Sequence, residues 1–278
     1  MGKEKLLENS EAERLLSEGL RLAGSSKKKD RALAAEYFEK ALELGCETAA
    51  YPMAVCFESG EGVKKDTKKA EKLYRRAAES GDARGWNALG AYLEEGAKAD
   101  MAQAIAAYRK AADMGDVWGL CNLAWCLRSG AGADKDDAEA VRLYEQAAGM
   151  GLAEAQCALA YALITGVCAD PDAESAAMWY EKAAAQKNAR AMVSLAYCCR
   201  GGIGCAKDEK RAAELDLEAA KLGDPDGLYN TGCLYLTGKC LPKDEEEAVK
   251  CFRKAAKQLH PRARYNLAVC LADGIGTE

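Results

Sequence analysis

A short alanine phrase returns along the chain at an almost constant interval, and it constrains the fold more than any other feature. Ala-Ala pairs stand at positions 77–78, 111–112, 147–148, 183–184, 219–220 and 255–256. Successive pairs are 34, 36, 36, 36 and 36 residues apart, and one further step back reaches Ala41. An interval in the mid-thirties is typical of arrays of helical hairpins, in which each hairpin buries its apolar face against its neighbours.

Residues 117–152 show the order of elements in one repeat. Apolar side chains at Leu120, Leu123, Ala124 and Leu127 have the spacing of one helix face. A Gly-Ala-Gly segment ends this helix, Asp136 precedes a second helix, and a glycine closes the repeat. We call the two predicted helices helix A and helix B. The chain is thus predicted to be all-α, an α/α superhelical solenoid of helix-turn-helix repeats of about 36 residues.

Several sets of positions recur in phase with the alanine pairs. Aspartate stands where each helix B begins, and there its carboxylate accepts hydrogen bonds from free backbone N–H groups. These residues are Asp30, Asp66, Asp100, Asp136, Asp172, Asp208 and Asp244. Alanines four and eleven positions later predict close helix contacts, because larger side chains there would overpack the seam. Glycine ends most helices, where a left-handed cap suits it, but Lys187-Asn188 and Leu259-His260 replace it twice.

One position in helix B, which we call the ring position, carries an aromatic side chain in almost every repeat. Its residues are Phe38, Tyr74, Tyr108, Tyr144, Tyr180 and Phe252. Asp216 takes this place in one repeat, between Leu215 and Leu217. Two interpretations remain open: a neighbouring leucine fills the space, or Asp216 is a buried carboxylate poised for function.

Longer phrases identify a family resemblance. Residues 60–81, which begin Gly-Glu-Gly-Val, resemble the Sel-one-like repeat, as do Trp-Tyr-Glu-Lys-Ala-Ala at 179–184 and Leu-Tyr-Leu-Thr-Gly at 234–238. The resemblance runs from about residue 10 to the end, and implies a tetratricopeptide-like solenoid that serves as an adaptor in assemblies and signalling. We expect a single domain, 1–278. Its repeats are approximately 10–46, 47–82, 83–116, 117–152, 153–188, 189–224, 225–260 and a partial repeat at 261–278.

Composition narrows the partners and the compartment. The net charge is −5, with acidic and basic residues mixed along the chain, so we do not expect a nucleic-acid partner. No apolar run approaches the ~20 residues of a membrane span, and the first residues lack the features of a signal peptide. We therefore expect a cytoplasmic protein, although a secreted or lumenal protein that has lost its leader would look the same. The last residues stop inside a glycine loop, which indicates either a capping helix A or a longer natural protein.

The cysteines and the single histidine do not suggest a metal site or a cofactor. The chain has 13 cysteines and one histidine, with no Cys-x-x-Cys. Most helix A cysteines are predicted to be buried as small apolar residues, namely Cys56, Cys121, Cys126, Cys157, Cys198 and Cys270. A cysteine-rich secreted branch of the resembled family bridges its helices with disulfides. Its cysteine spacing is missing here, which favours a reducing compartment, although Cys168, Cys205 and Cys240 lie in loops.

Serine chemistry is the enzymatic alternative. The cysteine-rich branch has been linked with penicillin binding, and Ser25-x-x-Lys28 and Ser26-x-x-Lys29 match the Ser-x-x-Lys form. Both lie in a basic loop without the accompanying Ser-Asp-Asn or Lys-Thr-Gly motifs. We expect no catalytic residues and a non-enzymatic protein, and we keep a β-lactam-binding, hydrolase-like protein as the alternative.

In the related tetratricopeptide fold, helix A lines the concave face. Transferred here, that geometry predicts an inner column of Tyr51, Asn87, Cys121, Cys157, Val193, Tyr229 and Tyr265 and an outer column of Val55, Ala91, Trp125, Tyr161, Tyr197, Cys233 and Val269. The candidate partner-binding residues are Arg84, Asn87, Trp118, Trp125, Arg128, Tyr161, Arg190, Tyr197, Arg200, Tyr229, Arg262 and Tyr265.

Arginine with tyrosine and tryptophan is the composition of binding hot spots. We therefore expect a scaffold that holds a peptide with acidic and apolar side chains. One alternative is that some of these aromatic side chains pack between repeats. Another is that the array is an adaptor segment of a larger membrane-associated complex.

Overall fold

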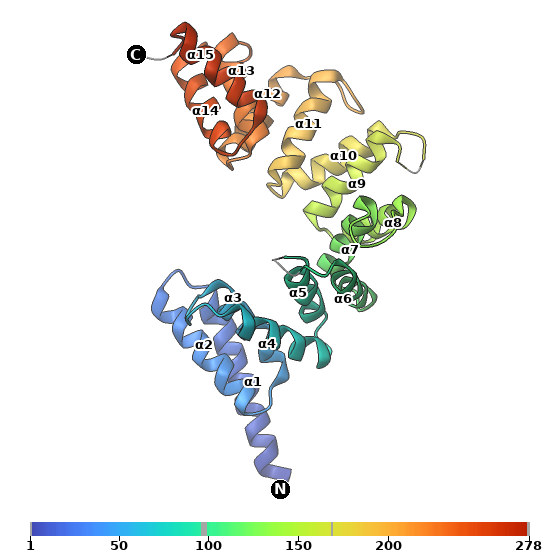
Figure 1. Cartoon of the computed structure of the whole chain (residues 1–278), viewed down its shortest axis with the longest axis vertical. Helices are drawn as coiled ribbons and strands as arrows, with labels where there is room; N and C mark the ends of the chain where they lie inside the picture. Colours follow the sequence, from blue (N-terminus) through green and yellow to red (C-terminus); the bar gives the residue numbers. More distant parts are fainter. Residues whose placement is uncertain (1, 96–98, 168, 277–278) are drawn as a thin grey trace. The chain divides into compact units, whose positions relative to one another are not determined.

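The computed structural model describes residues 2–95, 99–167 and 169–276, with side chains from residue 9 onward, and its regular elements in these ranges are all helical (Figure 1). They are α1 (Gly2–Ala23), α2 (Lys28–Glu43), η1 (Glu47–Ala49), α3 (Ala50–Ser59), α4 (Thr67–Glu79), α5 (Ala83–Glu94), α6 (Met101–Asp113), α7 (Val117–Ser129), α8 (Asp137–Gly149), α9 (Ala153–Thr165), α10 (Ala173–Ala185), α11 (Ala189–Gly201), α12 (Glu209–Lys221), α13 (Pro225–Thr237), α14 (Glu245–Lys257) and α15 (Pro261–Asp273). Odd-numbered helices are the predicted helices A and even-numbered ones the helices B. The all-α prediction is confirmed.

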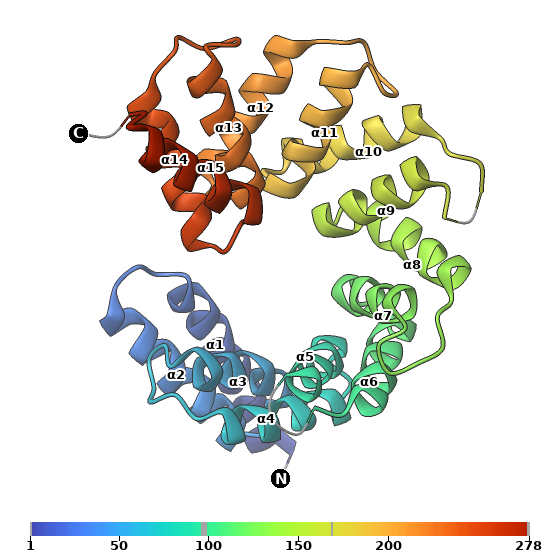
Figure 2. The ribbon, with the colours of Figure 1, turned by 45° about the horizontal axis from the view of Figure 1, so that its top comes forward.

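The chain forms two compact halves, Met1–Ala140 and Val141–Glu278, which we describe one at a time. In the N-terminal half the helix pairs α1–α2, α3–α4 and α5–α6 pack as hairpins, and α6 also contacts α7. In the C-terminal half the hairpins are α9–α10, α11–α12 and α13–α14, with α15 against α14, as Figure 2 shows for both halves. Each half is therefore a row of helical hairpins, as the repeat predicts.

The recurring aspartates begin the B helices as predicted, with one exception. At Asp208, for example, the carboxylate accepts a hydrogen bond from the backbone N–H of Arg211 at 2.9 Å. The prediction for Asp30 is wrong, because α2 already begins at Lys28 and Asp30 lies in its first turn. Ser26 stands where the corresponding loop of the next repeat has Gly62, which adopts a φ of 79°. Serine disfavours that left-handed conformation, so the chain turns into the helix earlier.

Glycines close most of the helices as predicted, and the two replacements keep the same backbone. Helices α3, α7, α9, α11, α13 and α15 each end in a left-handed glycine. Lys187 and Leu259, which replace the repeat-closing glycine, adopt φ values of 63° and 64°. The repeat geometry therefore imposes a left-handed residue even where the side chain disfavours it. Residues 96–98, where the shorter 34-residue interval falls, lie outside the described residues.

The seam between helices is built from small residues. The alanines four and eleven positions after each recurring aspartate are at most 1% exposed, from Ala34 to Ala255. At Gly119 in α7, an added Cβ would lie 2.6 Å from the Cβ of Ala111 in α6. At Gly90 in α5, an added Cβ would lie 2.6 Å from the ring of Tyr108. The helices approach so closely that these positions have no room for a side chain.

The aromatic residues at the ring position are all buried, and in four repeats the residue near the end of helix A matches the ring chemically. The Tyr74 hydroxyl donates to Glu58 Oε2 at 2.8 Å, and the Tyr108 hydroxyl donates to Glu94 Oε2 at 2.7 Å. Where the ring is phenylalanine, a leucine replaces the glutamate. Leu22 packs against the cluster that contains Phe38, and Leu236 against the one that contains Phe252.

Asp216 follows the same rule with a different pair. Its carboxylate is fully buried, and it accepts hydrogen bonds from the guanidinium of Arg200 and from Asn230 Nδ2, the latter at 2.9 Å. The expectation that Leu215 or Leu217 fills the ring position is therefore wrong. A carboxylate is tolerated there because a cation and an amide replace the water that it loses on burial. Asp216 is buried as the other interpretation required, but its partners are structural.

Candidate partner-binding surface

The outer column of helix A lies at the surface of both halves. In the N-terminal half, Val55 and Trp125 are 38% and 49% exposed. In the C-terminal half, Tyr161, Tyr197 and Val269 are 43%, 61% and 37% exposed. The ring position of helix B, by contrast, holds aromatic residues that are at most 3% exposed. Aromatic residues at one repeat position thus form the core, and those at another remain in contact with solvent.

The inner column is mostly engaged within the protein. Cys121 and Cys157 are buried, and Asn87 Oδ1 accepts a hydrogen bond from Asn122 Nδ2 at 2.9 Å. The Tyr229 ring stacks on His260, with centroids 4.9 Å apart. At the end of the column, Tyr265 is an exception, with 71% of its surface exposed. The inner column therefore packs the repeats together more than it faces a ligand.

The predicted arginines fall into two groups. Arg84 and Arg200 bind carboxylates of their own chain: Arg84 Nη2 lies 2.7 Å from Asp82 Oδ2, and Arg200 pairs with Asp216. Arg190 on α11 and Arg262 on α15 are exposed side chains of the C-terminal half. Of the remaining predicted residues, Trp118 is 44% exposed on α7, and Arg128 is half-buried on the same helix.

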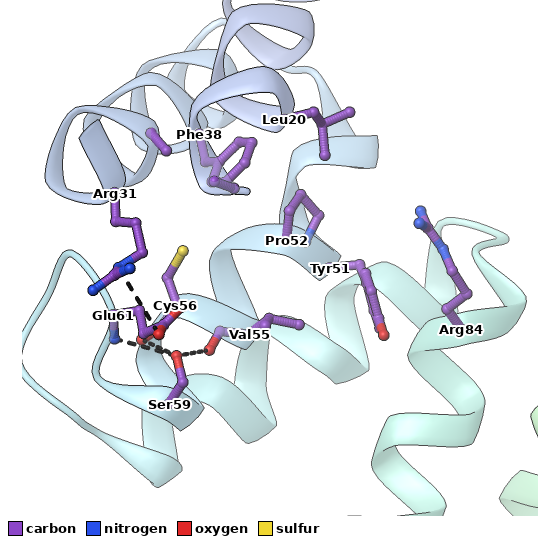
Figure 3. A pocket seen from close by; sticks show the side chains of 12 residues that line it. Leu20, Arg31, Phe38, Tyr51, Pro52, Val55, Cys56, Ser59, Glu61 and Arg84 are labelled. Atoms are coloured by element: carbon purple, nitrogen blue, oxygen red, sulfur yellow. Dashed lines mark hydrogen bonds and ion pairs between the residues drawn. The ribbon is translucent and has the colours of Figure 1, made fainter. Parts of the chain in front are cut away.

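A cavity of about 220 Å³ lies within the N-terminal half, between α1, α2, α3 and α5 (Figure 3). Its apolar wall consists of side chains from three of these helices, namely Leu20, Ala34, Phe38, Pro52 and Val55. Tyr51 and Val55 are the first members of the inner and outer columns, so the cavity lies where the predicted surface begins. Sequence analysis did not identify Leu20 or Pro52, because neither belongs to a set that recurs in other repeats.

The two ends of this cavity are polar. At one end the guanidinium of Arg84 lies over the Tyr51 ring, with Cζ 4.5 Å from the ring centroid. Burial raises the pKa of the Tyr51 hydroxyl, so this residue remains a neutral phenol at physiological pH. At the other end Arg31 Nε lies 3.8 Å from Glu61 Oε1 and is buried without a hydrogen-bond partner. The cavity thus combines an apolar wall with a guanidinium group at each end (Figure 3).

Local hydrogen bonds hold the first serine of the Ser-x-x-Lys motifs. The Ser25 hydroxyl donates to Asp30 Oδ2 at 2.6 Å and accepts from the backbone of Lys27, which ties it to the start of α2. In the ranges that the structure covers, no cluster of three or more His, Cys, Asp or Glu residues could hold a metal ion. None of the described helices has the length and apolar character needed to cross a lipid bilayer.

The predicted burial of the helix A cysteines is confirmed, whereas Cys168 lies outside the described residues.

The repeat itself decides the family. The Sel1 repeat matches eight segments of the chain, residues 10–46, 48–82, 87–116, 119–152, 153–188, 189–224, 225–258 and 261–278. The chain belongs to the Sel1 repeat family. Proteins built from Sel1 repeats are in general protein-interaction scaffolds. No curated protein sequence matches this Sel1 repeat chain.

Solved structures of Sel1 repeat proteins share its fold. A Sel1 repeat protein from Oxalobacter formigenes is 26% identical with a TM-score of 0.78, over 87% of this chain and 99% of that one. A protective antigen of uropathogenic Escherichia coli is 28% identical with a TM-score of 0.59. That match covers 96% of this chain but 66% of the antigen, so the Sel1 repeat chain spans about two thirds of it. Yeast Tom70, at 16% identity and a TM-score of 0.51 over 95% of this chain and 65% of Tom70, shares the fold alone.

Proposed function

We propose that this Sel1 repeat protein is a non-enzymatic adaptor whose helix A surface binds a segment of a partner protein with apolar and acidic side chains. The exposure of Trp125, Tyr161 and Tyr197 at one repeat position supports this proposal. A large aromatic side chain at the surface gains free energy when a partner removes it from water, at roughly 25 cal/mol per Å² of apolar area. The buried core does not include the rings of Trp125 and Tyr197, which are 49% and 61% exposed.

Charge favours an acidic partner over a purely apolar one. Arg190 and Arg262 are exposed on the A helices of the C-terminal half, and guanidinium groups bind carboxylates through paired hydrogen bonds. Arg84 and Arg200 are not assigned this role here, because they already pair with Asp82 and Asp216. The N-terminal half, taken by itself, offers a cavity for one apolar side chain of a ligand, beside Leu20 and Val55.

A selection experiment tests the proposal. The intact chain would be used to select binders from a random peptide library displayed on phage, and the Kd of each selected peptide would be measured by fluorescence polarisation. We expect the selected peptides to be enriched in Asp or Glu next to aromatic or aliphatic residues. We also expect Tyr197→Ser to weaken their binding about tenfold, since a hot-spot residue is worth more than 1 kcal/mol.

Matched variants separate surface binding from loss of folding. Met178 on α10 is exposed to a similar degree, 49%, but lies on helix B, so Met178→Ser should leave the Kd unchanged. Arg190→Glu should weaken binding more at low salt than at high salt, whereas Lys210→Glu on α12 should not. Peptides that bind equally well to the Tyr197→Ser and Met178→Ser variants would exclude the helix A surface as the binding site.

A further inference from the structure

Two thiol groups meet at the end of α11. The Cys205 thiol donates a weak hydrogen bond to Cys199 Sγ, and the two sulfur atoms are 3.9 Å apart. Cys199 lies in the last turns of α11 and is 3% exposed. Cys205 lies in the loop that follows and is partly exposed.

The backbone fixes this loop close to the helix. The backbone N–H of Ile203 donates to Cys198 O at 3.0 Å, and that of Asp208 donates to Cys199 O at 2.9 Å. On its other side the loop lies against the preceding repeat, because a Cβ on Gly204 would be 1.8 Å from the carbonyl oxygen of Ala173. Cys205 stands between these fixed points, so its approach to Cys199 follows from the fold of the loop.

Both cysteines line one cavity. This cavity measures about 360 Å³, and its wall includes Met178, Leu195 and Arg211 together with the two cysteines. It is large enough for a small molecule to reach the sulfurs without unfolding of α11. We propose that Cys199 and Cys205 form a redox-active dithiol, which a hydroperoxide oxidises to an intramolecular disulfide.

The reaction has two steps. In the first step, the thiolate of Cys205, the more exposed of the pair, attacks one oxygen of the hydroperoxide, and the O–O bond breaks. Cys205 becomes a sulfenic acid. The leaving group departs as an alcohol, or as water when the oxidant is hydrogen peroxide. The Cys199 sulfur then attacks the Cys205 sulfur, an S–S bond forms, and water leaves with the Cys199 proton. The two sulfurs are oxidised by two electrons in all, and the peroxide is reduced.

The environment assigns these roles. Burial raises the pKa of the Cys199 thiol to about 11, which disfavours it as the first nucleophile. The sulfur separation of 3.9 Å must shorten to the S–S length of about 2.05 Å. Closing this gap requires a rotation of the Cys205 side chain, which lines the cavity together with Cys199.

Peptide mapping tests the proposal on the full chain. The reduced protein would be exposed to a small molar excess of hydrogen peroxide, alkylated with iodoacetamide, digested with trypsin without a reductant and measured by mass spectrometry. Trypsin cuts after Arg200, which separates residues 201–207, with Cys205, from residues 191–200, with the other two cysteines of this region. We expect these two peptides to be joined, with a combined mass lower by two hydrogen atoms, and to separate on reduction.

Three serine variants identify the sulfurs. The joined peptides should persist in Cys198→Ser and be lost in Cys199→Ser and Cys205→Ser. Cys240 provides a matched control, because it is an exposed loop cysteine of the next repeat whose Sγ contacts the Glu209 carbonyl oxygen, at 3.6 Å, and not another sulfur. Cys240→Ser should not change the yield of the joined peptides.

Two outcomes would overturn the proposal. In the first, the joined peptides persist in Cys199→Ser, which would assign the bond to Cys198. In the second, the wild-type chain forms no joined peptides while its Cys205 accumulates as sulfinic acid. The wild-type measurement requires no substitution, so the second outcome is decisive even if a variant folds poorly.

Discussion

Arg200 and Asp216 form an ion pair across one helical hairpin, at a position where other repeats place an aromatic ring. The carboxylate of Asp216 is fully buried, whereas the Arg200 side chain is 34% exposed. The chain therefore has a charge in its core whose stability depends on a neighbour that reaches it from the surface.

Removing the cation should destabilise the protein strongly. Arg200→Ile leaves the Asp216 carboxylate buried with Asn230 as its remaining partner, and we expect a loss of about 3 kcal/mol in the free energy of unfolding. This loss lies at the lower end of the range for broken buried ion pairs. The Arg200 side chain is partly exposed, so water can reach the carboxylate where that side chain has been removed. Urea unfolding followed by circular dichroism measures the loss.

The preceding repeat supplies the compensating substitution. There Ile164 packs against the cluster that contains the buried Tyr180. The double variant Arg200→Ile/Asp216→Tyr reproduces that pair, and we expect it to recover stability to within about 1 kcal/mol of the wild type. A double variant no more stable than Arg200→Ile would show that the ion pair has a role that the ring cannot replace.

The titration of Asp216 gives a pH prediction. Burial raises the pKa of its carboxyl above the ordinary value of 3.8, although hydrogen bonds from Asn230 and Arg200 act in the opposite direction. The folded state then holds this proton more tightly than the unfolded state does. Its contribution to stability is fully present below pH 3.8 and is lost as the pH rises through the folded-state pKa.

Asp216→Asn is the reference that isolates this effect. As the pH rises from about 3.8 toward neutrality, the wild-type chain should lose stability relative to Asp216→Asn. Urea unfolding of both proteins at several pH values measures the difference, in which the other titrating groups largely cancel. A difference that grows in favour of the wild type with rising pH would mean that the Arg200 pair outweighs burial.

Gly90 and Gly149 should respond in opposite ways to the same substitution. A Cβ at Gly90 would lie 2.6 Å from the Tyr108 ring, whereas a Cβ at Gly149 would meet nothing within 4 Å. Gly90→Ala should therefore cost about 1–3 kcal/mol by overpacking. Gly149→Ala should stabilise α8 by up to about 1 kcal/mol, because alanine restricts the unfolded chain more than glycine does. Thermal unfolding distinguishes the two signs, and equal effects would contradict the packing at Gly90.

The cap of α10 should weaken in acid. Hydrogen bonds from Ser175, first from its side chain and then from its backbone, lower the pKa of the Asp172 carboxyl below 3.8. The stability that this carboxylate provides is present above pH 3.8 and is lost as the pH falls through its folded-state value. Asp172→Ala should thus be less stable than the wild type near neutral pH and about as stable in strong acid.

Asp170 serves as the control for this cap. It is an exposed aspartate in the same loop, two residues before the helix cap. Asp170→Ala should leave the stability unchanged at both pH values when measured by urea unfolding. If both substitutions had the same effect, the loss would reflect general charge and not the cap.

The repeating positions predicted the fold well, since each is set by a local rule that the whole array obeys. The alanine seam, the aspartate caps from Asp66 onward and the buried rings follow directly from the sequence. Asp30 departs from its set because the start of α2 depends on Ser26, which lacks the conformational freedom of glycine. The repeat pattern describes what recurs, so a departure at one position requires the structure.

The candidate surface was less predictable for the same reason. The sequence identified the outer column but could not separate exposed arginines from those already paired. Arg200 resembles a surface residue until Asp216, 16 positions later, is seen to take the place of a ring. A combined comparison of these two positions across the repeats would have found the pair. The cavity beside Leu20 and Pro52 had no repeating signal, because it occurs in one repeat.

Where the residue at the ring position matches its partner in helix A, the match restricts how such a gene can be rearranged. A duplication or deletion that moves a whole hairpin carries both members of a pair, so Arg200 keeps Asp216 and Glu58 keeps Tyr74. A crossover inside the loop between helix A and helix B would separate the members of a pair. It would join the helix A that carries Arg200 to a helix B with phenylalanine at the ring position, or join the helix B that carries Asp216 to a helix A with leucine at the partner position. Recombination in this lineage is therefore expected to be tolerated at the boundaries between hairpins and not within them.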